Sequence, residues 1–149
     1  MNPMEAHFKP NYENAKSKKE AVFQGNLYRI TILTERLVRL EFNKNGVFFD
    51  DLTEQVINRN FPVPDFKVSQ DDKYLEITTN YFMLKYQKEK PFEGLNLEIV
   101  LLNTDKSWYM ERTEARNFNT SGAGIDLTKP SYQKGLYSVD GFVSFSDSD

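Results

Sequence analysis

The sequence predicts an all-β protein built as an antiparallel β-sandwich. Aromatic residues make up 14% of the 149 residues, with 12 Phe and 8 Tyr, and such side chains suit half-buried sheet surfaces. Apolar and polar residues alternate with period two in several short runs, which is the strand pattern. Turn residues separate these runs, and no window shows the 3.6-residue apolar period of a long helix. Many short strands with mostly one apolar face favour a sandwich.

The first expected strands lie close to the N-terminus. Residues 1–19 are polar and are expected to form a flexible lead-in to a single sandwich domain over 20–149. Alternation predicts strands over 27–33 and 36–42, joined tightly at Thr34-Glu35. Asn45-Gly46 suits the positive φ angles of a hairpin turn, so Val47–Phe49 is expected to be the returning strand.

Further strands are expected at regular spacing along the chain. Proline, Asp-Asp and Gly residues mark the turns between them. They are predicted over residues 55–58, 66–69, 74–79, 81–86 and 95–102. The stretch 112–131 is rich in Asn, Thr, Ser and Gly and is expected to be a long loop.

Composition excludes several classes of function. Nineteen Lys and Arg against 22 Asp and Glu give a net charge of −3, so no broad basic face is available for nucleic acid. The chain has no Cys and one histidine, His7, which excludes disulfides, a thiol nucleophile and a multi-histidine metal site. Its longest apolar run, 99–102, is too short to cross a bilayer, and we expect no membrane partner and a cytoplasmic location.

Strong catalytic motifs are absent from the sequence, so we assign no catalytic, cofactor-binding or metal-binding residue. The acidic pairs Asp50-Asp51 and Asp71-Asp72 are expected to be polar turn residues, because a glycosidase needs carboxylates that face each other across a cleft. Trp108 and Tyr109 are the candidate carbohydrate contacts, since sugar faces stack on aromatic rings. The same two rings could instead fill the core between the sheets.

Two longer stretches resemble a known family. The first comprises Tyr28-Arg-Ile-Thr-Ile-Leu-Thr-Glu-Arg-Leu-Val-Arg-Leu-Glu-Phe42, Gly46-Val-Phe-Phe-Asp-Asp51, Val56-Ile-Asn-Arg59 and Phe61-Pro-Val-Pro64. The second comprises Asn117-Phe118, Ile125-Asp126, Gly135-Leu-Tyr-Ser138, Asp140-Gly-Phe142 and Asp147-Ser148. In order and spacing they resemble the N-terminal β-sandwich domain of glycoside hydrolase family 31, which includes α-glucosidases and α-xylosidases. The chain departs from the family pattern at Val139, Phe142 and Ser146.

The resemblance implies a galactose mutarotase-like sandwich that belongs to a larger retaining α-glycosidase acting on α-linked oligosaccharides. In that family the catalytic aspartates lie on a (β/α)8 barrel of about 250 residues, which these 149 residues do not contain. The domain is therefore expected to be non-catalytic, to pack on the barrel and to contribute to the rim of the active site. An apolar surface that the barrel covers is expected, with Tyr137, Phe142 and Phe145 on it.

Two alternatives stay open at the level of sequence. The chain could be a stand-alone carbohydrate-binding module, as its aromatic content and sandwich pattern allow. It could also be a self-sufficient sugar epimerase, although such an enzyme needs histidine and carboxylates around a sugar ring for proton transfer, and His7 is the single histidine.

Overall fold

The computed structural model describes residues 11–53 and 56–109, together with the strand residues 117–118 and 137–138. The chain forms two compact units, Met1–Met110 and Glu111–Asp149. In the second unit, β9 (Asn117–Phe118) pairs with β10 (Tyr137–Ser138) in antiparallel fashion. The other C-terminal residues of the family resemblance, and the side chains of Tyr137, Phe142 and Phe145, lie outside the described residues.

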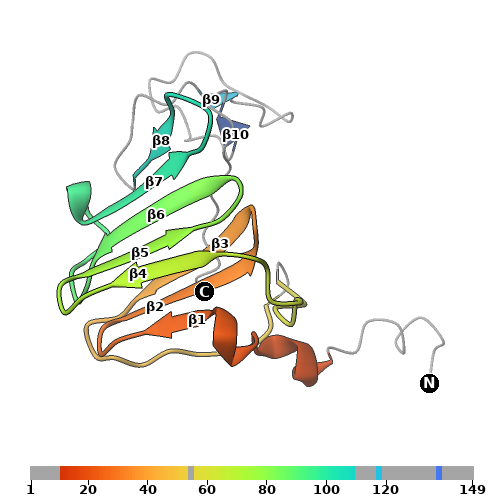
Figure 1. Ribbon diagram of the computed structural model, residues 1–149. Helices are drawn as coiled ribbons and strands as arrows, with labels where there is room; N and C mark the ends of the chain where they lie inside the picture. The colour runs from red at the N-terminus through yellow and green to blue at the C-terminus, as the bar shows by residue number, and fades with distance from the viewer. Residues whose placement is uncertain (1–10, 54–55, 110–116, 119–136, 139–149) are drawn as a thin grey trace, which may run out of the picture. The chain divides into compact units, whose positions relative to one another are not determined.

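A three-stranded antiparallel sheet begins the first unit (Figure 1). It has the order β1 (Val22–Gln24), β2 (Tyr28–Thr34) and β3 (Leu37–Phe42). Side chains alternate across each strand, so Ile30 and Ile32 of β2 face one side while Arg29 and Thr31 face the other. One face of this sheet is therefore apolar and the other is polar.

The second sheet of this unit has five antiparallel strands in chain order. They are β4 (Lys67–Gln70), β5 (Tyr74–Thr78), β6 (Phe82–Gln87), β7 (Leu97–Leu101) and β8 (Ser107–Trp108). The described residues also form three short 3-10 helices, namely η1 (Tyr12–Ala15), η2 (Lys19–Ala21) and η3 (Gly94–Asn96). Figure 1 shows the sheet of β4 to β8, coloured green to teal, beside the orange strands β1 to β3.

The core lies between the apolar faces of the two sheets. Tyr28 of β2 meets Tyr86 of β6 edge-on, with ring centroids 4.8 Å apart. Tyr86 also contacts Phe92, which in turn packs edge-on against Phe42 of β3. The fully enclosed members of this core are Ile30, Ile32, Leu75, Ile77, Leu84, Tyr86 and Leu97. The predicted all-β antiparallel sandwich is thus confirmed.

Most of the predicted strands are present, and two are wrong. The strands expected over 27–33, 36–42, 66–69, 74–79, 81–86 and 95–102 correspond to β2 to β7. Val47–Phe49 is not a strand, because the Phe49 carbonyl accepts hydrogen bonds from arginine side chains. Residues 56–58, expected to be part of a strand over 55–58, are also irregular. The short strands β1, β8, β9 and β10 were not predicted, and β9 lies within the stretch 112–131 that was expected to be a long loop.

The turn expected at Asn45-Gly46 is present in a different form. Gly46 has φ +69°, as the turn requires, while Asn45 is not among the residues with positive φ. The Gly46 amide donates to the Asn43 carbonyl over 2.9 Å, which closes a turn at the end of β3. The chain then leaves the sheet and does not return as a hairpin.

Residues 11–19, expected within the lead-in, make defined contacts. The amide of Arg59 donates to the carbonyl of Asn14 over 2.7 Å. The hydroxyl of Ser17 donates to the carbonyl of Arg59 over 2.9 Å. Ala15 is buried. This part of the N-terminal segment therefore packs against the chain that joins β3 to β4.

Candidate functional site

The polar face of the three-stranded sheet carries a row of charged side chains. Arg29 of β2 lies opposite Glu41 of β3 and Gln24 of β1, and Thr31 lies opposite Arg39. These residues occupy alternate strand positions, so they share the face that points away from the core. Arg29 and Thr31 are nonetheless buried, which means that other parts of the chain cover this face.

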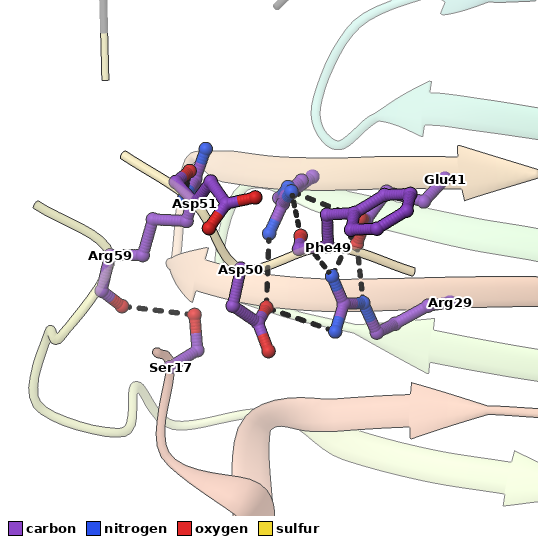
Figure 2. Close-up of polar contacts among 8 residues, drawn as sticks. Ser17, Arg29, Glu41, Phe49, Asp50, Asp51 and Arg59 are labelled. Carbon is purple, nitrogen blue, oxygen red and sulfur yellow. Dashed lines mark hydrogen bonds and ion pairs between the residues drawn. The ribbon is translucent and has the colours of Figure 1, made fainter. Parts of the chain in front are cut away.

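Arg29 is the centre of an ion-pair network on this face (Figure 2). Its Nε and one terminal nitrogen lie 2.7 Å from the two carboxylate oxygens of Glu41. The other terminal nitrogen lies 3.0 Å from Oδ1 of Asp50. Arg39 reaches the same Glu41 carboxylate over 2.9 Å. The side chains of Arg29 and Glu41 are only 9% and 16% exposed, so loss of either partner would leave a largely buried charge unpaired.

The network also holds the described part of the segment that joins β3 to β4, residues 43–53 and 56–66, here called the β3–β4 connection. The Phe49 carbonyl accepts hydrogen bonds from Arg29 over 2.9 Å and from Arg39 over 3.2 Å. Arg59, which is 2% exposed, donates to the Asp51 carbonyl from within the same connection. Side-chain donors thus satisfy backbone carbonyls that a strand would pair with a neighbouring strand.

Electrostatics hold the central arginine in its charged form. Burial opposes the charge on Arg29, but the hydrogen bonds and charges of Glu41 and Asp50 outweigh it and raise the pKa of Arg29. The guanidinium therefore stays protonated. Its donors are directed at Glu41, Asp50 and Phe49, so this arrangement pairs the charges and positions the backbone at Phe49.

Large apolar side chains project into solvent from this fixed connection. Phe49 is 65% exposed and Ile57 is 70% exposed, although the backbone near each of them is held by the contacts described above. Val47 and Val63 of the same connection are also exposed. A segment with a fixed backbone and exposed apolar side chains has the composition of an interaction surface.

The predicted carbohydrate contacts lie at the edge of the five-stranded sheet. Trp108 is half-buried in β8, opposite Ile99 of β7, and packs against the core. Tyr109 follows it and is also half-buried. Trp108 therefore fills part of the core, which was the alternative to sugar stacking. A carbohydrate contact by this pair stays a prediction.

The two acidic pairs in the described residues behave differently. Asp71 caps a turn by accepting hydrogen bonds from the amides of Lys73 and Tyr74, and the amide of Tyr74, followed by that of Lys73, lowers the pKa of Asp71. The expectation of a turn residue is correct there. It is wrong for Asp50, whose carboxylate pairs with Arg29. No sequence pattern links Asp50 to Arg29, which lies 21 residues earlier in the chain.

The ion-pair network was missed by sequence reasoning, although a signal for it exists. Arg29, Arg39 and Glu41 all fall on the polar side of the predicted alternation. The pairing of β2 with β3 places Arg29 opposite Glu41, but the register shifts between Ile32 and Thr34, so this partner cannot be counted from the turn alone. The pairing with Asp50 depends on an irregular segment and could not be counted in this way.

Two further findings concern the described residues alone. No group of three or more Asp, Glu or His side chains among them is arranged to hold a metal ion. None of their helices has the length and apolarity that crossing a bilayer requires.

Comparison of the chain with models of protein families gave no match, and a comparison with curated proteins gave none either. The resemblance to glycoside hydrolase family 31 therefore stays a prediction, and the function derived from it is a proposal.

Proposed function

We propose that this chain is the non-catalytic N-terminal β-sandwich domain, of the galactose mutarotase-like type, of a retaining α-glycosidase of the family 31 kind. Its partner is a (β/α)8 barrel of the parent protein, which carries the catalytic aspartates and acts on an α-linked oligosaccharide. The proposal rests on the resemblance over 28–64 and 117–148 and includes the cytoplasmic location expected from the sequence.

One observation supports this role above the others, namely the fixed β3–β4 connection with its exposed apolar side chains. Arg29, Glu41, Asp50 and Arg59 all belong to the stretch that resembles the family, and together they hold this connection in place. Single exposed apolar residues are common on protein surfaces. The β3–β4 connection has four exposed apolar residues, including Phe49 and Ile57, and this number favours the interpretation that another domain covers them.

The contacts of this connection also explain why it could serve as a docking element. A flexible loop loses conformational entropy when it docks, at about 1–2 kcal/mol for each residue whose backbone becomes fixed. Here the backbone at Phe49, Asp51 and Arg59 is already held by side chains and by the N-terminal segment. Docking on the barrel would therefore bury Phe49 and Ile57 with little further loss of entropy.

Binding of an apolar dye to the chain tests the proposed docking surface. We expect fluorescence enhancement of such a dye with the unmodified chain, and a clear loss of it in the double variant Phe49→Ser, Ile57→Ser. Leu95→Ser is the matched control, because Leu95 is 84% exposed but lies at η3, outside the connection. Equal dye binding by the unmodified chain and the double variant would count against the docking surface.

A further inference from the structure

A pocket opens on the polar face of the three-stranded sheet, beside the ion-pair network. It has a volume of about 440 Å³, within the range of roughly 300–1,000 Å³ that is usual for small-molecule sites. Its walls come from three places in the sequence. Lys16 and Lys19 come from the N-terminal segment, Arg29 and Arg39 from the sheet, and Asp50 from the β3–β4 connection.

The charge on the lining is strongly positive. The four cations Lys16, Lys19, Arg29 and Arg39 face one carboxylate, that of Asp50, so the lining carries 4 − 1 = +3. Glu41 stands behind the two arginines and pairs with both of them. Lys16 and Lys19 are exposed and form no ion pair with any residue that the structure describes. The pocket is therefore an attractive place for an anion within a chain whose net charge is negative.

Arg39 lines this pocket and has N–H groups that can donate hydrogen bonds to a ligand. One terminal nitrogen lies 2.9 Å from Glu41 and 3.2 Å from the Phe49 carbonyl. The other lies 3.7 Å from Asp50, beyond hydrogen-bond distance, so its protons are available to a ligand. Burial lowers the pKa of Arg39, and repulsion by Arg59 and Arg29 lowers it further. The negative charges of Glu41 and Asp50 raise this pKa but do not outweigh the other causes. An anion beside Arg39 would offset that burial and repulsion.

Val22 and three neutral hydrogen-bonding side chains make up the rest of the lining. Ser17, Gln24 and Thr31 contribute a hydroxyl, an amide and a second hydroxyl to the same pocket. Such groups suit the hydroxyls of a polyol, while guanidinium and ammonium groups suit a phosphate. We propose that this pocket binds a small phosphorylated polyol of the size of a monosaccharide phosphate, with its phosphate at Arg39, Lys16 and Lys19. This proposal goes beyond the docking role and does not depend on it.

Calorimetric titration of the full chain with glucose 6-phosphate at low ionic strength tests the proposal. We expect saturable binding that weakens by roughly tenfold in Lys16→Gln, Lys19→Gln, because two charges that contact the phosphate are lost. The matched control is Lys18→Gln, Lys44→Gln, which removes the same charge from exposed lysines outside the pocket. Binding by this control is expected to change by less than about twofold. The arginines are left intact because they hold the β3–β4 connection.

Two further ligands separate the possible sources of binding. Glucose should not bind, and inorganic phosphate should bind more weakly than glucose 6-phosphate. Equal affinity for inorganic phosphate and glucose 6-phosphate would overturn the polyol part of the proposal. The absence of saturable binding at about 10 mM ligand, or an equal loss of affinity in both double variants, would overturn the site itself.

Discussion

Arg29 and Glu41 face each other across β2 and β3 and form an ion pair with two hydrogen bonds, each 2.7 Å long. The pair lies on the face of the sheet that points away from the core, yet Arg29 is buried because the β3–β4 connection crosses above it. This pair therefore joins the sandwich to a covering layer of irregular chain. The proposed docking surface and the proposed anion pocket both adjoin it.

The substitution Glu41→Gln should destabilise the protein. The amide keeps the shape of the side chain but leaves the buried guanidinium of Arg29 with one carboxylate in place of two. We expect the free energy of unfolding to fall by about 2–3 kcal/mol, as measured by urea denaturation. Glu93→Gln, at an exposed position before η3, is the control and should change it by less than about 0.5 kcal/mol. A loss no larger than that of the control would show that the network is not a stabilising element.

Gly46 and Gly94 offer a matched pair of substitutions. Both have positive φ, at +69° and +53°. A Cβ at Gly46 would lie 2.5 Å from the Asn26 carbonyl oxygen, whereas a Cβ at Gly94 would meet open space. We expect Gly94→Ala to lower the free energy of unfolding by about 1 kcal/mol, because alanine is strained at a positive φ. Gly46→Ala should lower it by about 1–2 kcal/mol more, because its Cβ would also clash with the Asn26 carbonyl. Thermal unfolding of the two variants measures the difference, and equal losses would contradict the turn geometry at Gly46.

The buried tyrosines predict a loss of stability at alkaline pH. Burial is the main cause that raises the pKa of Tyr86, and Glu89 and Tyr28 raise it further, against the hydrogen bond that the Lys90 amide donates to the Tyr86 hydroxyl oxygen. Burial raises the pKa of Tyr28 in the same way. Above about pH 10 the unfolded chain loses phenol protons that the folded chain retains, so the free energy of unfolding falls as pH rises. Below about pH 10 this contribution is fully present.

Urea denaturation at about pH 8 and about pH 11 checks this expectation, with a predicted loss on the order of 1 kcal/mol per pH unit for each buried tyrosine. Tyr86→Phe should be less stable at about pH 8, because it lacks the 2.6 Å hydrogen bond to Lys90. It should also show a shallower loss toward about pH 11. The same pH dependence in Tyr86→Phe and in the unmodified chain would show that another group causes it.

Substitution of Trp108 distinguishes a structural role of this residue from a carbohydrate contact. Because its side chain packs against the core, Trp108→Ala should lower the free energy of unfolding by about 2–3 kcal/mol, and Trp108→Phe should lower it much less. Calorimetry with malto-oligosaccharides tests the alternative. Sugar binding by the unmodified chain that disappears in Trp108→Ala, with stability unchanged, would support the carbohydrate-binding module and contradict the packing role.

The sequence predicted the regular strands because their signal is local. In β2 and β3 the apolar side chains recur at every second position, and a two-residue turn at Glu35-Arg36, one residue later than predicted, joins the strands. A register shift between Ile32 and Thr34 adjusts their pairing. β8 has only two residues, too few for alternation to be recognised. Val47–Phe49 was expected to be the returning strand of a hairpin because it follows the turn signal Asn45-Gly46. Its carbonyl at Phe49 is instead satisfied by Arg29 and Arg39, and such contacts leave no periodic pattern.

The candidate sites were less accessible to sequence reasoning than the strands. The charged face of β2 and β3 follows from alternation, but the pocket also needs Lys16, Lys19 and Asp50, which come from irregular segments. Residues separated by irregular chain are brought together by tertiary packing alone. Sequence reasoning therefore identified Trp108 and Tyr109, whose residue type is conspicuous, and missed the arginines.

If this chain is the N-terminal domain of an α-glycosidase, as we propose, a catalytic barrel follows it in the parent protein. The most direct test is the nucleotide sequence of the source DNA beyond the codon for Asp149. We expect an open reading frame that continues with alternating strand and helix patterns over about 250 codons or more, with aspartates where a barrel would hold them. A stop codon directly after Asp149 would contradict the claim.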